Sequence, residues 1–258
     1  MSALAVITLS NAGARLASRL ARELGPCDRF VHRDVAPRFP GERFDAVLAL
    51  TRRIFRRYRQ LIYIMPCGVV VRALDGRLRH KTQDPAVVVV DAGGRYCVSL
   101  LSGHEGGANA LALRAANALA AEPVISTTTE AAKDVIVGVG CRRGAAAADI
   151  VAAVREGLRR ARVRPGRVRL LASADIKKRE AGLIEAAAQL GVGLRFISSG
   201  EIRATAKAFG RSAFVQRKVN LPAVAEPAAL LAGRRTRLLL PKTILHGATV
   251  AVARENCL

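Results

Sequence analysis

The alternation of short apolar runs with helical patterns restricts the fold of this chain more than any other feature. Residues 4–9 (LAVITL) form an apolar run typical of a buried strand. Leu16, Leu20 and Leu24 follow at intervals of four, which places them on one face of a helix. Strand–helix alternation favours a mainly parallel sheet covered by helices. The sequence therefore predicts an α/β fold.

The alternation pauses and starts again in the middle of the chain. Residues 127–134 (TTTEAAKD) are largely polar, and a new strand is predicted at 135–139 directly after them. At 258 residues the chain also exceeds the usual size of one compact domain. We therefore expect two layered α/β domains with mainly parallel sheets, residues 1–134 and residues 135–258.

Several shorter patterns predict the elements of the first domain. Strands are expected at 45–50 (DAVLAL) and 61–65 (LIYIM), on either side of a basic helical segment at 52–57. The β-branched run 87–90 and residues 96–101 enclose a Gly-Gly turn signal, so they are predicted to pair as a hairpin.

Composition limits the cellular location and the metal chemistry. No apolar run approaches the roughly 18 residues that cross a bilayer, and the first residues lead into a strand without a basic leader. The five cysteines contain no C-x-x-C pair, and the four histidines are equally dispersed. We expect a cytoplasmic protein with no membrane contact and no metal ligands of its own.

The strongest compositional signal is the formal net charge of +22, from 42 Lys and Arg against 20 Asp and Glu. Most of these cations are Arg, which holds carboxylates and phosphates in a bidentate fork. The predicted partner is an anion, although Arg-rich coding or a hot habitat would also raise the count. Nucleic acid is disfavoured because the sequence has no helix-turn-helix, zinc-finger or aromatic RNA-recognition pattern. A polycarboxylate small molecule is the other candidate.

The most unusual segment is 99–109 (SLLSGHEGGAN), where a strand leads into three glycines around a His-Glu pair before a helix. Such a turn in a parallel sheet lies at the carboxyl edge, where ligands bind, and apolar packing gives no reason for the glycines. The alternative is a Gly-rich helix cap. We predict His104 and Glu105 as catalytic proton-transfer groups. The expected substrate-binding residues here are Ser102, Gly103, Gly106, Gly107 and Asn109.

Upstream of this turn, four residues are candidates for clamping substrate carboxylates. Gly68 and Arg72 belong to one segment, and Lys81 and Asp84 precede the strand at 87–90. Their spacing is equally compatible with an alternative, in which the two cations are solvated at the surface and Asp84 caps its own turn.

The second domain offers a candidate anion site between a strand and a helix. The segment 138–144 (GVGCRRG) approaches the dinucleotide-binding fingerprint, but its spacing differs by one residue, so a nucleotide cofactor is not expected. Gly140, Arg142 and Arg143 are predicted to hold an anion at the helix start. Lys177 and Glu180, in a later charged cluster, are further candidates. A tight turn and solvated helix faces are the alternatives.

Taken together, these segments resemble one family. The strings "MPCGVVVRAL", "KTQDPAVVVVD", "SLLSGHEGGANALA" and "PVISTTTE" look like the amino-terminal domain of the cobalt-precorrin-5A hydrolase family of anaerobic cobalamin biosynthesis. "VGVGCRRGA", "LASADIKKREAGLIEAAAQLGV" and "VNLPAVAEPAALLAG" look like its carboxyl-terminal domain. The chain is a compact form without the family's middle linker region, and Ser212-Ala213 stands where the family tends to have Ser-Glu.

The resemblance implies an enzyme that opens the ring A δ-lactone of cobalt-precorrin-5A with water and releases acetaldehyde. It implies no separate cofactor, because cobalt is already in the macrocycle. It also implies that cobalt-precorrin-5A and water are the partners, with a homo-oligomer or transient contacts to neighbouring pathway enzymes as further options. A non-catalytic tetrapyrrole carrier is the alternative function.

Overall fold

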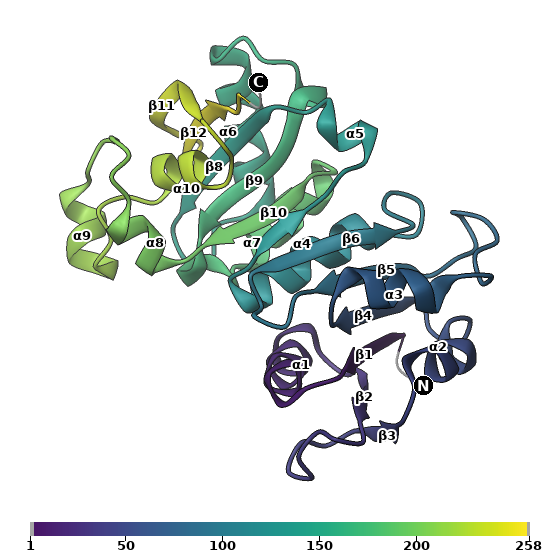
Figure 1. The fold of residues 1–258 in the computed structure, drawn as a ribbon. Helices are drawn as coiled ribbons and strands as arrows, with labels where there is room; N and C mark the ends of the chain where they lie inside the picture. Colours follow the sequence, from purple (N-terminus) through teal and green to yellow (C-terminus); the bar gives the residue numbers. More distant parts are fainter. Residues whose placement is uncertain (1–2, 257–258) are drawn as a thin grey trace. The chain divides into compact units, whose positions relative to one another are not determined.

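The computed structural model describes residues 3–256, which divide into two compact units with the boundary between Thr127 and Thr128 (Figure 1). Each unit is one sheet with helices on both faces. The predicted fold class, two α/β domains with mainly parallel sheets, is confirmed.

The first unit has a seven-stranded sheet in the order β3-β2-β1-β4-β5-β6-β7. Strands β3, β2, β1, β4 and β5 are mutually parallel, whereas β6 pairs antiparallel with β5 as the predicted hairpin, and β7 runs parallel to β6. The strands are β1 Leu4–Thr8, β2 Asp28–His32, β3 Glu42–Phe44, β4 Gln60–Ile64, β5 Ala86–Val90, β6 Tyr96–Leu101 and β7 Glu122–Val124.

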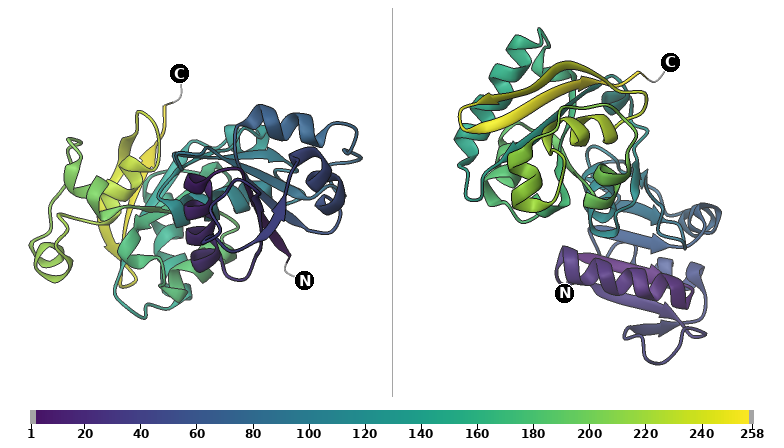
Figure 2. Two further views of the ribbon diagram at one scale, coloured as in Figure 1. Left: turned by 60° about the horizontal axis from the view of Figure 1, so that its bottom comes forward. Right: turned by 90° about the vertical axis from the view of Figure 1, so that its left-hand side faces the viewer.

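Four helices cover this sheet. Helices α1 (Asn11–Leu24) and α4 (Ala108–Leu119) pack on one face, where Leu20 and Leu111 meet the strands. Figure 2 shows α1 lying along its face of the sheet. Helices α2 (Val47–Ile54) and α3 (Cys67–Leu74) pack on the other face.

Helix α2 corrects the strand predicted at 45–50. Leu50, Thr51 and Ile54 are buried, while Leu48 and Arg52 are exposed, and this one-sided burial has the period of a helix. The apolar residues of this segment are also compatible with a short strand. In so short a segment, length does not distinguish a helix from a strand. The strand that precedes α2 is instead β3, three residues long.

The turn between β5 and β6 is held by one carboxylate. Asp91 Oδ1 accepts the backbone N–H groups of Arg95 and Tyr96, both at 2.7 Å, and Oδ2 accepts that of Gly93 at 3.1 Å. Burial raises the pKa of Asp91, but these hydrogen bonds lower it by more, so the net pKa is below the usual value.

We expect Asp91→Asn to lower the free energy of unfolding by about 1–2 kcal/mol at pH 7, because the amide is uncharged and keeps only one of the two acceptor oxygens, so at least one of the backbone hydrogen bonds is lost. A lowered folded pKa means that this stability is present above the unfolded pKa of about 4 and is lost as pH falls through the folded value. Urea unfolding at pH 7 and pH 3 should show a difference that shrinks in acid. Asp75→Asn, which changes an exposed carboxylate, is the control; an equal loss in both variants would contradict the role of Asp91.

The second unit has a five-stranded sheet in the order β10-β9-β8-β12-β11. Strands β8, β9 and β10 are parallel, β12 pairs antiparallel with β8, and β11 forms an antiparallel edge. The register of β11 shifts between Leu238 and Leu240 and again before Thr243. The strands are β8 Val135–Cys141, β9 Val168–Ala174, β10 Gly193–Ile197, β11 Arg237–Leu245 and β12 Ala248–Arg254.

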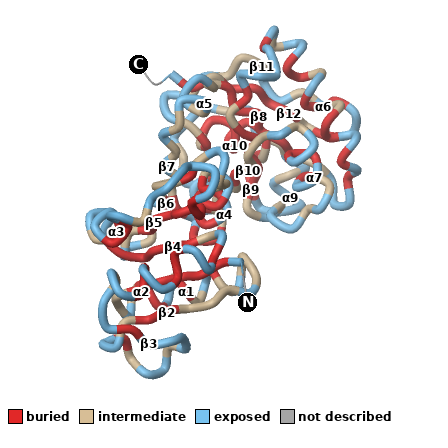
Figure 3. Tube along the Cα trace, turned by 90° about the vertical axis from the view of Figure 1, so that its right-hand side faces the viewer, coloured by how far each residue is buried: buried red, intermediate tan, exposed pale blue. Residues whose placement is uncertain are grey.

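Helices α6 (Ala147–Arg160) and α7 (Ala181–Gln189) cover one face of this sheet, and α8 (Ser199–Ala204) and α10 (Ala225–Leu231) cover the other. Short helices α5 (Thr128–Ala131) and α9 (Ala213–Val219) complete the unit with the 3₁₀ turns Pro165–Arg167 and Asp175–Lys177. Figure 3 shows that buried residues follow the central strands of each sheet. No helix within residues 3–256 is long and apolar enough to cross a membrane.

Candidate functional site

The segment 102–109 lies at the opposite edge of the sheet from the one the sequence predicts. Because β6 runs antiparallel to β5, its carboxyl end lies beside the start of β5, with Leu101 paired to Val87. The carboxyl ends of β1, β4 and β5 are at the other edge, about 16 Å away for a five-residue strand. The predicted hairpin itself causes this reversal.

The three glycines of the turn have structural reasons that the sequence did not reveal. A Cβ on Gly103 would lie 2.7 Å from Thr127 Cγ2, and a Cβ on Gly106 would lie 2.4 Å from Ser102 Cβ. Gly107 caps α4 with φ +85°, a left-handed conformation that favours glycine. The expectation that packing offers no reason for these glycines is therefore wrong. Their structural roles still leave their backbone N–H groups able to bind a ligand.

Asn109 is also held by its own unit. Ser99 Oγ donates to Asn109 Oδ1 at 2.8 Å, and Asn109 Nδ2 donates to Thr127 Oγ1 at 3.0 Å. These bonds tie the start of α4 to β6 and to the segment after β7.

The hydroxyl of Ser102 is a buried polar group that the fold leaves without a hydrogen bond. The residue adopts φ +58°, and its side chain is buried with no hydrogen-bond partner for Oγ. A buried hydroxyl without a partner loses a hydrogen bond to water, which costs about 1–3 kcal/mol. A buried, unpartnered hydroxyl in a non-glycine left-handed residue is a feature found more often at functional sites than elsewhere.

Glu105 forms an ion pair with Lys81, whose Nζ lies 2.5 Å from Glu105 Oε1. The hydrogen bond from Lys81 lowers the pKa of Glu105, so the carboxyl is ionised at neutral pH. It can accept a proton or orient a cation, but it is not an acid at that pH. His104 is exposed beside it. The structure thus brings together Lys81, His104 and Glu105 as titratable side chains at one turn.

The other three upstream candidates have different positions. Asp84 is buried and both carboxylate oxygens accept the Arg79 N–H, at 3.2 and 2.9 Å, as in the turn-capping alternative. Gly68 lies in the first turn of α3 at the carboxyl edge of β4, and Arg72 Nη1 donates to its carbonyl at 3.3 Å. Gly68 and Arg72 are therefore not grouped with Glu105.

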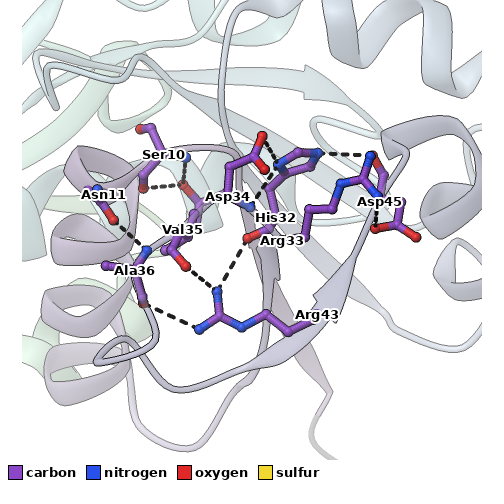
Figure 4. Close-up of polar contacts among 10 residues, drawn as sticks. Ser10, Asn11, His32, Arg33, Asp34, Val35, Ala36, Arg43 and Asp45 are labelled. Atoms are coloured by element: carbon purple, nitrogen blue, oxygen red, sulfur yellow. Dashed lines mark hydrogen bonds and ion pairs between the residues drawn. The ribbon is translucent and has the colours of Figure 1, made fainter.

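The carboxyl edge of β1, β2 and β3 carries a polar network that is satisfied internally (Figure 4). The guanidinium of Arg43 donates to the carbonyls of Val35 and Ala36 at 2.5 and 3.3 Å, and Ala36 N–H donates to Asn11 Oδ1 at 2.8 Å. His32 contacts Asp34 Oδ2 through Nδ1 at 3.2 Å and the Asp45 carbonyl through Nε2 at 2.9 Å. These groups fix the loop after β2.

In the second unit, the predicted residues gather where β8 and β9 end. Glu180 Oε1 accepts the Gly144 N–H at 2.7 Å, and Lys177 Nζ lies 3.5 Å from Glu180 Oε2. Arg142 and Arg143 are exposed in the same turn. Gly140 lies within β8 opposite Thr249.

Cys141 lies beside this cluster. Burial raises the pKa of its thiol, and Lys177 opposes that shift only in part. The thiol is therefore protonated at neutral pH, which removes the activation that a nucleophilic cysteine needs.

Sequence reasoning missed a surface cleft in the second unit, of about 370 Å³. It is bordered by the end of α8, the irregular segment after it and Pro222, and it includes Arg203, Lys207 and Arg211. The three cations are spaced by four in sequence, which resembles one face of a helix, but α8 ends at Ala204. Among residues 3–256 no group of three or more His, Cys, Asp or Glu could hold a metal ion.

The fold places this chain among two-domain α/β proteins, and comparison with known families is more specific. Residues 49–130 match the family model "Cobalamin synthesis G N-terminal", and residues 135–253 match "Cobalamin synthesis G C-terminus". The two matches follow each other in order along most of the chain. The chain therefore belongs to the cobalamin synthesis G family, and the resemblance noted in the sequence is confirmed.

Three curated relatives support this assignment. The chain is 42% identical over 130 residues to a cobalt-precorrin-5A hydrolase of Salmonella typhimurium, and 43% identical over 98 residues to one of Priestia megaterium. The aligned parts cover 49% and 38% of this chain but only 36% and 26% of those proteins. It is also 34% identical over 128 residues to Protein CobE of a Sinorhizobium species, covering 49% of this chain and 83% of that protein.

Two solved structures are similar to the chain. A cobalamin biosynthesis protein G homolog from Sulfolobus solfataricus is 19% identical, with 98% of this chain and 97% of that chain covered and a TM-score of 0.39. The crystal structure of CobE is 31% identical, with 47% and 90% covered and a TM-score of 0.44.

Proposed function

We propose that this protein hydrolyses cobalt-precorrin-5A to cobalt-precorrin-5B and acetaldehyde. The observation that carries the proposal is the membership of both halves of the chain in the cobalamin synthesis G family, together with the identity to two cobalt-precorrin-5A hydrolases. The protein would act in the cytoplasm, and the cobalt would enter with the substrate rather than in a site of the protein.

The reaction requires a base at two points. Water adds to the δ-lactone, which frees the ring A acetate and leaves a hydroxyl on C20. Loss of the hydroxyl proton then lets the bond between C20 and the macrocycle break: C20 leaves with its methyl group as acetaldehyde, and the bonding electron pair passes to the macrocycle. A positioned base and groups that stabilise negative charge would accelerate both steps.

We assign this chemistry to the turn 102–109. Glu105 is ionised and held by Lys81, so it can accept a proton or position His104. Arg142 and Arg143, exposed in the second unit, would bind substrate carboxylates.

The test is to incubate the purified protein with cobalt-precorrin-5A and to trap the released acetaldehyde. Stoichiometric acetaldehyde together with cobalt-precorrin-5B supports the proposal. Tight binding of the substrate without acetaldehyde would instead make the protein a tetrapyrrole carrier, and neither binding nor release would refute both functions.

A further inference from the structure

The cleft of the second unit is built from an irregular segment, residues 205–211, rather than from a helix or strand. Its walls include Ile202 and Phe209, and its charged lining residues are Arg203, Lys207 and Arg211. No Asp or Glu is among its lining residues. The cleft is therefore a concave surface with a local excess of positive charge, which favours an anion.

The segment is fixed in place by buried anchors. Glu226 is 3% exposed, and its carboxylate accepts the Gly210 N–H at 2.5 Å and the Lys242 N–H at 2.7 Å. Lys242 Nζ donates to the Arg211 carbonyl at 2.6 Å. These contacts tie the segment to α10 and β11, so the backbone that carries Arg211 is held before any ligand arrives.

The three cations have different roles. Lys207 Nζ donates to the Leu230 carbonyl at 2.5 Å and to Thr236 Oγ1 at 3.0 Å, so Lys207 is another anchor. Arg203 makes one long hydrogen bond, 3.5 Å to the Asn220 carbonyl. Within residues 3–256 the guanidinium of Arg211 has no carboxylate partner. Arg203 and Arg211 are thus the cations available to a ligand.

We propose that this cleft binds a carboxylate arm of a tetrapyrrole, with Arg203 and Arg211 as the ligand-binding residues. The inference rests on the proposed function for the identity of the ligand. A volume of about 370 Å³ is at the small end of ligand sites, so the cleft accommodates an acetate or propionate arm and an adjoining ring rather than the whole macrocycle. Two guanidinium groups match a carboxylate through charge-assisted, bidentate hydrogen bonds.

The experiment is a titration of the full chain with uroporphyrin III, a stable tetrapyrrole with free acetate and propionate arms, followed by its absorbance. The Arg203→Gln/Arg211→Gln double variant should bind at least 10-fold more weakly than the wild type. Both side chains are exposed, so the substitutions leave the core intact, which circular dichroism and thermal unfolding would check. Arg155→Gln, which removes an exposed cation from α6 on the other face of the sheet, should bind like the wild type.

An equal affinity in the double variant, an equal loss in Arg155→Gln, or no binding of uroporphyrin III by the wild type would overturn the inference. The acetaldehyde assay is separate: release of acetaldehyde with unaffected binding in the double variant would refute only the cleft. Loss of binding without any acetaldehyde release by the wild type would refute only the hydrolase.

Discussion

Replacing His104 or Glu105 with alanine is expected to lower the rate of acetaldehyde release by about 10²-fold, the usual scale for losing a general acid or base. Both side chains are exposed on the turn before α4, so the fold should persist. Single-turnover assays with cobalt-precorrin-5A would measure the rate, and thermal unfolding would confirm the fold. Asp75→Asn, an exposed carboxylate elsewhere in the same unit, is the control.

The Lys81–Glu105 pair gives this prediction a second readout. Because Lys81 lowers the pKa of Glu105, Lys81→Met should raise that pKa. If the ionised Glu105 is the active form, the acidic limb of the pH–rate profile moves to higher pH in Lys81→Met. Near wild-type rates in the His104 and Glu105 variants would show that the turn is structural, and the base would then be sought at Asp175 or Glu180.

A large loss of stability is expected from Gly138→Ala in strand β8. A Cβ at this position would lie 1.9 Å from the Ala225 carbonyl oxygen and 3.0 Å from Ala229 Cβ, so α10 would have to move away from the sheet. Overpacking typically lowers the free energy of unfolding by about 1–3 kcal/mol. Because backbone atoms cannot move aside as easily as side chains, we expect Gly138→Ala to lower it by about 3 kcal/mol or more.

Gly140→Ala is a matched control in the same strand and on the same face. Its Cβ would make only ordinary contacts, 3.5 Å to Val224 Cβ and 3.7 Å to Thr249 Cβ. Urea unfolding of both variants should therefore show a large loss for Gly138→Ala and a loss below about 1 kcal/mol for Gly140→Ala. Similar values for the two would mean that α10 is not packed on β8 as described.

The fold class was predictable because the periodicity of apolar residues reflects local geometry. The secondary structure of residues 45–50 was not predictable. A helix of eight residues and a short strand can contain the same apolar residues when one face is buried. The reversal of β6 was implicit in the predicted hairpin. Because of this reversal, the turn 102–109 does not lie at the carboxyl edge of the parallel strands. That position follows only from the order of all the strands in the sheet.

The site was less predictable than the fold. The Lys81–Glu105 pair joins residues 24 positions apart whose proximity follows only from the pairing of β5 with β6. Glycine is required at 103 and 106 because Thr127 and Ser102 lie too close for a Cβ. The spacing of residues in the sequence does not identify these neighbours. The cleft at Arg211 depends on a buried carboxylate, Glu226, that in sequence looks like one more acidic residue in the first turn of a helix.

The irregular register of β11 limits how one edge of the second sheet can pair with another molecule. An unpaired outer strand usually offers its N–H and C=O groups to another chain, and regular edges are sites of uncontrolled stacking. Here Pro241 lacks an N–H group, Lys242 follows it, and the two register shifts interrupt the straight row of donors and acceptors. The exposed Ile244 therefore does not lie on a regular edge strand that could pair with another chain. Pairing of β11 with a strand of another molecule is therefore disfavoured, and β10 is the other outer strand of this sheet.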